Sequence, residues 1–190
     1  MLRILAGEFR SRRLASPDDD ETSRPYLNRV KESVFNILRE WCDDAVVLDL
    51  FAGIGTMGLE AASRGACSVV CVEKSKSIFA FLERNIETLD CGDRVIAVEG
   101  DALGSSCLLR APQPVDLVFM DPPYRMMRDV QSARRVLGQI EACRDVMGER
   151  GFVVLRTPAG ADGPDLTIPG FQGPESHRYR GQWVHLYSPG

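Results

Sequence analysis

The sequence has few of the residues from which metal centres and disulfide frameworks are built. Its 190 residues include only two histidines and six cysteines, the cysteines are scattered, and no C-x-x-C pair occurs. This spacing does not match a zinc site, so we predict no bound metal. The cysteines are expected to be small buried residues in a reducing compartment.

Long hydrophobic runs are absent as well. The N-terminus meets a charge at Arg3, and the apolar run AVVLDLFAGI is interrupted by Asp49, far short of the ~20 residues that cross a bilayer. The sequence therefore predicts neither a signal peptide nor a membrane partner, and we expect the protein in the cytoplasm.

What remains is an ordinary globular composition, with 44% hydrophobic and 26% charged residues, which argues against intrinsic disorder. The length corresponds to about one domain, and we expect a monomer. The net charge of −4 by itself disfavours a nucleic-acid partner, but eight of the 23 Lys and Arg lie in residues 1–39. This basic cluster is either a solvated surface or an RNA-facing patch.

From residue 45 onward, short apolar runs alternate with helical periodicity, the order typical of a parallel sheet built from βαβ units. The pattern predicts strands at 45–50, 68–73, 94–99, 115–120, 151–157 and 183–187, and helices at 56–65, 75–89 and 128–147. Ser75 is expected to cap the second of these helices, and the Gly- and Pro-rich segment 158–174 is expected to be a loop. Ahead of the sheet, 2–14 is predicted to be a small β-hairpin and 28–41 a helix.

A glycine-rich turn follows the first predicted strand. Gly53-x-Gly55-x-x-Gly58 matches a dinucleotide-binding fingerprint, and Glu73 falls 20 residues after Gly53, where an acid that binds ribose hydroxyls belongs. Alone the match is weak, and a turn without a ligand is the alternative. Asp49 would repel the pyrophosphate of NAD but attract the cationic amino group and sulfonium of S-adenosylmethionine (SAM), so the sequence favours SAM.

A third acidic residue follows the third predicted strand, in the segment Glu99-Gly-Asp101-Ala102. Asp101 at this edge can accept a hydrogen bond from an adenine amino group, while a neighbouring backbone amide meets the ring. A generic Gly-Asp turn is the alternative. We predict that this segment binds the adenine of the cofactor.

The fourth predicted strand runs directly into Asp121-Pro122-Pro123-Tyr124. Because the two prolines have no amide donors, the Asp121 carboxylate and the Pro122 carbonyl form a rigid pair of acceptors for the two N–H bonds of an exocyclic amine. Tyr124 is expected to stack on the base. No strong base is needed, because the proton leaves readily once the methylated nitrogen is cationic.

These motifs together resemble one known family. The series LDLFAGIGTMGLEA, VCVE, GDA and DPPY, preceded by RILAGEFRSRRL and RPYLNRVKESVFNIL, resembles the bacterial RsmD family of 16S rRNA guanine-N2 methyltransferases over nearly the whole chain. The resemblance implies a Rossmann-like α/β fold, a mostly parallel sheet with helices on both faces, preceded by a small N-terminal hairpin and helix. It implies a methyltransferase domain over 43–190 and an RNA-facing extension over 1–42.

The resemblance also implies roles for individual residues. SAM would be bound by Asp49, Phe51, Gly53, Gly55, Glu73, Asp101 and Ala102, and the guanine N2 by the residues Asp121 to Tyr124. The partner would be 16S rRNA or a small-subunit assembly particle, contacted through Arg10, Arg12, Arg13, Arg24, Arg29, Arg125 and Arg128. The chain departs from the family at Tyr26, Leu27 and Asn28, where threonines and an aspartate are usual.

Other functions remain open from the sequence. The Asp-Pro-Pro-Tyr motif also suits transfer to adenine N6 or cytosine N4 in DNA or RNA, although the chain has no room for a separate target-recognition domain. A non-catalytic module that binds RNA or SAM is a second alternative, against which the intact motif argues. An NAD-dependent dehydrogenase is disfavoured because no proton-relay set of His, Tyr and Lys accompanies the sheet.

Overall fold

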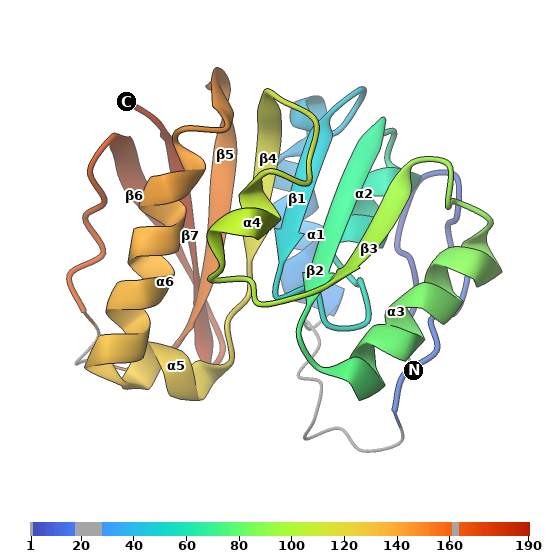
Figure 1. Cartoon of the computed structure of the whole chain (residues 1–190), viewed down its shortest axis with the longest axis horizontal. Coiled ribbons are helices and arrows are strands. Elements are labelled where there is room, and N and C mark those ends of the chain that lie inside the picture. The colour runs from blue at the N-terminus through green and yellow to red at the C-terminus, as the bar shows by residue number, and fades with distance from the viewer. Residues whose placement is uncertain (1, 18–27, 161–163) are drawn as a thin grey trace.

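The computed structural model describes residues 2–17, 28–160 and 164–190 (Figure 1). Its strands are β1 (Val46–Leu50), β2 (Ser68–Glu73), β3 (Val95–Glu99), β4 (Val115–Met120), β5 (Met147–Pro158), β6 (Phe171–Tyr179) and β7 (Gln182–Pro189). Its α-helices are α1 (Asn28–Ile37), α2 (Gly58–Ser63), α3 (Lys76–Leu89), α4 (Ser105–Leu108), α5 (Tyr124–Arg128) and α6 (Val130–Cys143). A short 3₁₀ turn, Arg39–Trp41, follows α1.

The described strands form one sheet in the order β3-β2-β1-β4-β5-β7-β6. Strands β1 to β5 are parallel, and β7 pairs antiparallel with both β5 and β6. The chain winds from β1 outward to β3 and then returns to β4 on the other side of β1, so the winding direction reverses between β1 and β4. This is the Rossmann-like α/β fold that the sequence predicts, and ligands of such sheets bind where the direction reverses.

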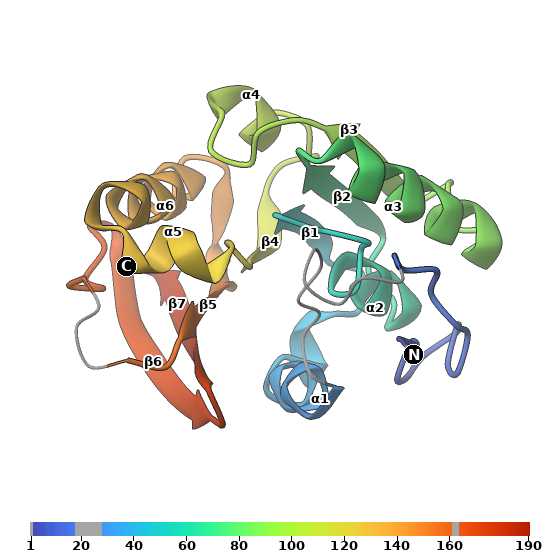
Figure 2. The same ribbon diagram turned by 90° about the horizontal axis from the view of Figure 1, so that it is seen from below.

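Two hydrophobic clusters cover the two faces of the sheet, because its central strands are apolar on both sides. One cluster joins the sheet to α1, α2, α3 and the N-terminal segment, and the other joins it to α4, α5 and α6. Figure 2 shows α1 and α2 on one side of the sheet and α4 and α6 on the other. The carboxyl ends of the parallel strands are left at one edge, which these helices do not cover.

The central strands β1 to β4 are confirmed within one residue, but β5 begins at Met147 rather than at residue 151, and several other predicted elements differ from the structure. The segment 158–174 is not all loop, because β5 continues to Pro158 and the edge strand β6 begins at Phe171. The helix predicted over 128–147 is divided into α5 and α6. Ser75 precedes α3, but its side chain makes no capping hydrogen bond with a backbone amide.

The N-terminal segment is tied to α2 by a buried carboxylate that no sequence motif revealed. Residues 2–14 form a hairpin-like turn with a single bridge, between Arg3 and Arg13. The Glu60 side chain accepts hydrogen bonds from the amides of Leu5 (2.8 Å) and Ala6 (3.0 Å) and pairs with Lys31 of α1 at 3.0 Å. Glu60 thereby connects the N-terminal segment, α1 and α2, whose N-terminus adjoins the glycine-rich turn.

No helix among the described residues is long and apolar enough to cross a membrane.

Candidate active site

A cavity of about 770 Å³ opens at the carboxyl edge of the sheet, where the winding direction reverses. Its walls come from the turn after β1, the ends of β2 and β5, the loop after β3, and the segment from Asp121 into α5. The lining residues are Phe51, Ala52, Gly53, Ile54, Thr56, Val72, Glu73, Lys74, Ser75, Ile78, Asp101, Ala102, Leu103, Asp121, Pro122, Pro123, Tyr124, Arg125, Met126, Arg128, Arg135 and Arg156. The structure therefore brings together the predicted motifs VCVE, GDA and DPPY and part of the glycine-rich motif LDLFAGIGTMGLEA.

The three positions of the turn after β1 that carry glycine do not all require it for the same physical reason. A Cβ on Gly58 would lie 2.5 Å from the Cys71 sulfur, and a Cβ on Gly55 would lie 2.6 Å from a methyl group of Leu82. Both glycines are therefore required by packing, and neither lines the cavity. Gly53, at φ +57°, lines the cavity, and a Cβ there would meet nothing within 4 Å. Only Gly53 offers open space to a ligand.

Alanine at Gly55 is therefore expected to destabilise the fold far more than alanine at Gly53. Both positions have positive φ, which costs an alanine ~1–2 kcal/mol, but Gly55→Ala also overpacks the core against Leu82 for a further ~1–3 kcal/mol. Urea unfolding of the two variants measures the difference. Equal losses of unfolding free energy would mean that packing against Leu82 is not the reason why position 55 requires glycine.

Asp49 is buried on β1 and is not exposed in the cavity. Its side chain is 1% exposed, is not among the lining residues, and accepts a hydrogen bond from the Gly58 amide at 2.8 Å. Burial raises the pKa of Asp49 to about 8, and the nearby carboxylates of Asp121 and Glu73 add to this rise. Attraction of a cationic ligand by the Asp49 carboxylate stays a prediction, and the raised pKa works against it. Its observed contact instead holds the start of α2 against β1.

Glu73 lies at the end of β2 and supports both segments that border the cavity. One carboxylate oxygen accepts a hydrogen bond from the Gly53 amide (2.9 Å) and the other from the Ser75 amide (2.6 Å). Because a carboxylate oxygen can accept more than one hydrogen bond, Glu73 retains acceptor capacity toward the cavity. It is thus an acid at the cavity wall in the position that the sequence predicts.

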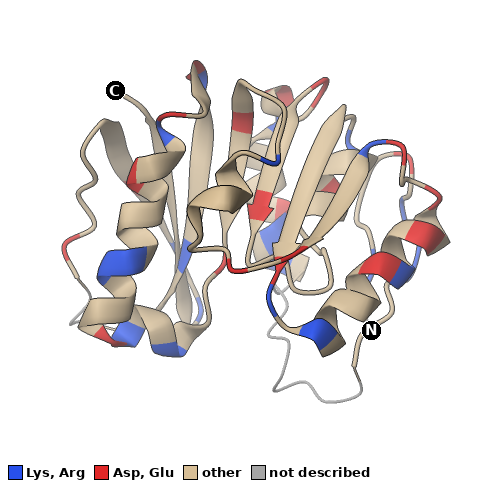
Figure 3. Ribbon diagram, in the orientation of Figure 1, with Lys and Arg blue, Asp and Glu red and all other residues tan. Residues whose placement is uncertain are grey.

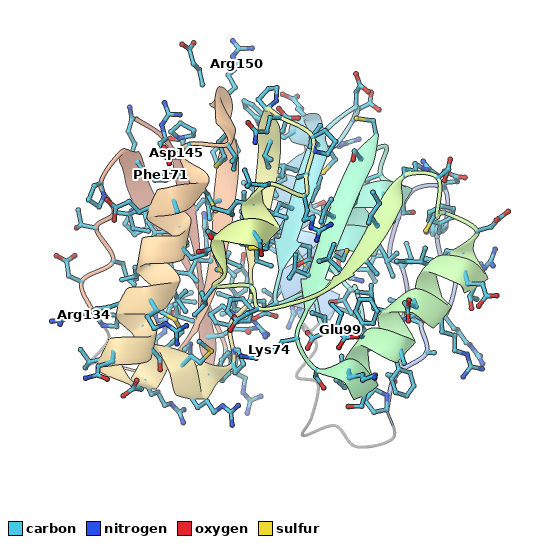
Figure 4. All side chains as sticks on the ribbon, viewed as in Figure 1. Lys74, Glu99, Arg134, Asp145, Arg150 and Phe171 are labelled. Atoms are coloured by element: carbon cyan, nitrogen blue, oxygen red, sulfur yellow. The ribbon has the colours of Figure 1, made fainter. Side chains whose placement is uncertain are left out.

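Asp101 lines the same wall, one strand further along the sheet. Its carboxylate accepts a hydrogen bond from the Leu103 amide (3.0 Å) and pairs with Lys74 at 2.9 Å. The bond from Lys74 is the main reason that the pKa of Asp101 is lowered, so the side chain is ionised. Figure 4 shows Lys74 near Glu99 at the carboxyl edge. This agrees with the register of β2 and β3, because Lys74 directly follows Glu73, which pairs with Glu99.

Asp121 directly follows β4 and lines the cavity. Its amide donates to the Leu50 carbonyl, just before the glycine-rich turn, at 3.4 Å, and its carboxylate pairs with the Nε atom of Arg156 at 2.5 Å. Arg156, on β5, is 4% exposed. Burial raises the pKa of Asp121 to about 6, and the charge and hydrogen bond of Arg156 limit the rise. At pH 7 the carboxylate is therefore mostly ionised, held between a buried cation and the cavity.

Two further side chains complete this group of polar contacts. The Tyr124 hydroxyl donates to the Gln182 side-chain oxygen at 2.8 Å, and a guanidinium nitrogen of Arg156 donates to the same oxygen at 3.1 Å. The Arg156 guanidinium carbon also lies 5.2 Å from the centre of the Tyr124 ring, a cation–π distance. Arg156 therefore fixes the carboxylate and the tyrosine ring with respect to one another.

Sequence reasoning missed Arg156 and Gln182, although one signal for the arginine was visible. Arg156 is the single charge in the otherwise apolar predicted strand GFVVLRT, and a buried charge in such a strand requires a partner. Gln182 carries no comparable signal. It reaches the site because β7 returns antiparallel beside β5, with Gln182 next to Pro158 in the register.

The predicted arginines are divided between two regions. Arg125 and Arg128 of α5 line the cavity, together with Arg135 of α6. Figure 3 shows blue bands on α5 and the adjoining part of α6, whereas the segment that leaves β3 is red. The cavity thus has a basic side at α5 and an acidic side at the ends of β2 and β3.

The other predicted arginines that the structure describes do not line the cavity. Arg12 donates to the Thr88 carbonyl in the last turn of α3, about 15 Å along that helix from the cavity residue Ile78. Arg10 and Arg13 belong to the same exposed turn and do not line the cavity, and their contact with RNA stays a prediction. Arg29 is exposed in the first turn of α1, and Arg24, with Tyr26 and Leu27, lies outside the described residues.

Comparison with known proteins gives a consistent result. The family model described as conserved hypothetical protein 95 matches residues 2–170. Ribosomal RNA small subunit methyltransferase D of Escherichia coli is 39% identical over 124 residues, which cover 65% of this chain and 61% of that protein. The Haemophilus influenzae protein of the same name is 38% identical over 65% of this chain and 64% of its own length. The matched part thus spans less than two thirds of these relatives.

Solved structures extend the likeness over the whole chain. A putative methyltransferase from Escherichia coli superposes with a TM-score of 0.79 and 29% identity, over 99% of this chain and 97% of that one. A hypothetical protein from Thermus thermophilus gives a TM-score of 0.75 at 29% identity over 98% of both chains. With a family model that matches most of its length, the chain belongs to the conserved hypothetical protein 95 family, which is the RsmD family.

Proposed function

We propose that this protein transfers a methyl group from SAM to the exocyclic N2 amine of a guanine in 16S rRNA. The observation that carries the proposal is the ionised Asp121, held by Arg156 beside Tyr124, in a cavity that the adjacent glycine-rich turn also lines. The family membership and the names of the relatives support a methyltransferase that acts on small-subunit rRNA.

The acidic side of the cavity fits the chemistry of SAM. Gly53 leaves open space at the turn, and Glu73 offers acceptors for the two ribose hydroxyls. Asp101 and the Ala102 backbone, which line the cavity with the apolar Phe51, are proposed to recognise the adenine. When bound, SAM supplies a methyl group activated by its sulfonium. Asp49 and Gly55 act indirectly, by fixing the turn that carries Gly53.

Asp121 is proposed to accept one N–H of the guanine amine, with the Pro122 carbonyl accepting the other. These acceptors favour the tetrahedral nitrogen that forms during transfer over the planar amine of the free base. The carboxylate also stabilises the positive charge that develops on nitrogen, in a largely buried setting where charge interactions are stronger. The Tyr124 ring holds the base by stacking, and its hydroxyl remains anchored on Gln182.

The basic side of the cavity is proposed to meet RNA. Arg125, Arg128 and Arg135 come from α5 and α6 at the cavity rim, where they can neutralise phosphates beside an extruded guanine. The partner is 16S rRNA or a small-subunit assembly particle, which places the protein in the cytoplasm. Contacts of Arg10, Arg12, Arg13, Arg24 and Arg29 with more distant parts of the RNA remain predictions, as do the monomeric state and the two-part division at residue 42.

Labelled SAM tests the proposed reaction. The protein is incubated with methyl-labelled SAM and, in parallel, with 16S rRNA, with small subunits that lack the modification, and with DNA. We expect label in one or both of the ribosomal substrates. Label in DNA alone would contradict the proposal, and SAM binding without transfer to any substrate would favour a non-catalytic module.

Glu73→Gln is expected to weaken SAM binding ~10–150-fold, the equivalent of ~1.5–3 kcal/mol for a charge-assisted hydrogen bond. The amide presents one acceptor oxygen where the carboxylate presents two. Glu99→Gln is the matched control, because Glu99 pairs with Glu73 in the neighbouring strand but does not line the cavity. Isothermal titration calorimetry measures both. Equal SAM affinity in the two variants would remove Glu73 from the cofactor site.

A further inference from the structure

A second cavity, of about 480 Å³, lies on the other side of α5 from the candidate active site. It is bounded by α5, the end of β5, the residues Ala159, Gly160, Pro164 and Leu166 that follow β5, and the hairpin formed by β6 and β7. Arg128 lines both cavities, so the same short helix separates them. The volume lies within the ~300–1,000 Å³ that is usual for small-molecule sites. Neither the motifs in the sequence nor the proposed reaction uses this cavity.

The floor of this second cavity is a row of three polar side chains from neighbouring strands. His185 of β7 shares one ring nitrogen with the Thr157 hydroxyl (2.9 Å) and the other with the Ser176 hydroxyl (2.8 Å). Burial lowers the pKa of His185 to about 4, so the ring is neutral at pH 7. A neutral ring has one N–H and one lone pair, so one hydroxyl donates to it and the other accepts from it. The accepting hydroxyl keeps its own proton to donate, and both hydroxyls keep lone pairs.

One wall of the cavity is aromatic and is backed by positive charge. Trp183 lines the cavity and lies nearly parallel to the His185 ring, at an interplanar angle of 15° and a centroid distance of 6.3 Å. The Arg178 guanidinium carbon, from the paired position on β6, is 5.8 Å from the centre of the Trp183 ring. Met127 of α5 is another apolar lining residue. An aromatic surface with nearby arginines and hydroxyl groups suits a nucleobase of single-stranded RNA, which stacks by its face and hydrogen-bonds by its edge.

We propose that this cavity binds the nucleobase of an RNA nucleotide next to the target guanine. This inference rests on the proposed function, because it takes the substrate to be RNA. An RNA strand that placed its target guanine against Tyr124 would have α5 and Arg128 between that base and its neighbour. Trp183 would then stack on the neighbouring base, and the Thr157–His185–Ser176 row would read its edge. The second cavity would thereby select the sequence context of the modified guanine.

The tryptophan content allows a direct test. The sequence contains two tryptophans, and Trp41 packs against Phe152 with ring centroids 5.0 Å apart, so Trp41→Phe leaves Trp183 as the single emitter. Titration with 16S rRNA, excited at 295 nm, is expected to quench the Trp183 emission because a stacked base quenches indole fluorescence. Should Trp41→Phe not fold, ¹⁹F NMR of the wild-type chain labelled with 5-fluorotryptophan gives one signal per tryptophan, and only the Trp183 signal should shift.

Two variants at Trp183 connect binding to catalysis. Trp183→Ala is expected to raise the KM for RNA about 5–150-fold, the equivalent of one base–aromatic stack, and to leave SAM affinity unchanged. Trp183→Phe keeps a ring and should retain most of the affinity. Calorimetry with SAM and steady-state methylation of 16S rRNA measure both parameters.

The outcomes separate the second cavity from the proposed reaction. Unchanged Trp183 emission at RNA concentrations that saturate the protein in filter binding would overturn the inference, as would an RNA KM unaffected by Trp183→Ala. Emission that responds to small subunits but not to a 16S rRNA that the protein methylates would assign the cavity to another component of the particle and also overturn it. Quenching of Trp183 without methyl transfer to any RNA would instead contradict the proposed function and leave the nucleobase site standing.

Discussion

Asp121→Ala is expected to slow methyl transfer ~10²–10⁴-fold, the usual range for a group that acts on the reacting proton or charge, while SAM affinity stays near the wild-type value. Asp121→Asn keeps an oxygen acceptor but loses the negative charge that faces the developing cation, so its rate should lie between those of the wild type and Asp121→Ala. The cofactor contacts come from other segments, namely the turn after β1 and the ends of β2 and β3.

The pairing of Asp121 with Arg156 determines which variants are informative. Asp121→Ala leaves the buried Arg156 cation without this carboxylate, which is expected to cost ~3–5 kcal/mol of unfolding free energy. The double variant Asp121→Ala/Arg156→Leu should recover stability without recovering rate. Rapid-quench measurement with saturating SAM gives the rate of the chemical step, and urea unfolding gives the stability. A wild-type rate in the folded double variant would exclude Asp121 from the chemistry.

The second large effect is expected at Arg156, which does not touch the proposed substrate amine but positions Asp121. In the wild type, Asp121 is ionised above its pKa of about 6, so the transfer rate should rise through that pH and then remain level. Removing an adjacent positive charge raises a carboxyl pKa by ~1–3 units. Arg156→Gln should therefore lose activity at pH 7 and regain much of it near pH 9, whereas Arg156→Lys should shift the profile less.

The titration of a second buried acid, Asp49, needs to be distinguished from this effect of Arg156. The pKa of Asp49 is raised to about 8 and is coupled to both Asp121 and Glu73, so its titration falls in the same pH range. Asp49→Asn keeps an acceptor for the Gly58 amide and removes that titration, so the profiles are best compared in this background. A loss of activity in Arg156→Gln that is equal at every pH would mean that Arg156 has only a structural role.

The parts of the fold that follow from local pattern were predictable. The buried parallel strands are continuous apolar runs, and the glycine-rich turn and Asp-Pro-Pro-Tyr each follow such a run directly. Because the carboxyl ends of parallel strands meet at one edge, Glu73, Asp101 and Asp121 could be assigned to one cavity from the sequence alone. The edge strand β6 was not predictable in this way, because its nine residues alternate irregularly and include Gly173 and Pro174.

Features that depend on how distant segments pack were beyond the sequence patterns. Asp49 was placed correctly at the end of β1, but its complete burial and raised pKa follow from the packing of α2. Arg156 and Gln182 meet Asp121 and Tyr124 only because β5 lies between β4 and β7. No pattern in the sequence determines the position of the basic turn that contains Arg12. The Glu60 contacts hold the N-terminal segment against α2, and Arg12 itself bonds to the last turn of α3.

The most direct test of the proposed function is mass spectrometry of the nucleosides of 16S rRNA after incubation with the protein and isotopically labelled SAM. The proposed geometry of Asp121, Pro122 and Tyr124 predicts N2-methylguanosine as the labelled product, formed at a single site and strongly reduced with Asp121→Ala. Label on a ring nitrogen, on a ribose hydroxyl, or on adenine or cytosine would contradict the assignment of these acceptors to the guanine amine.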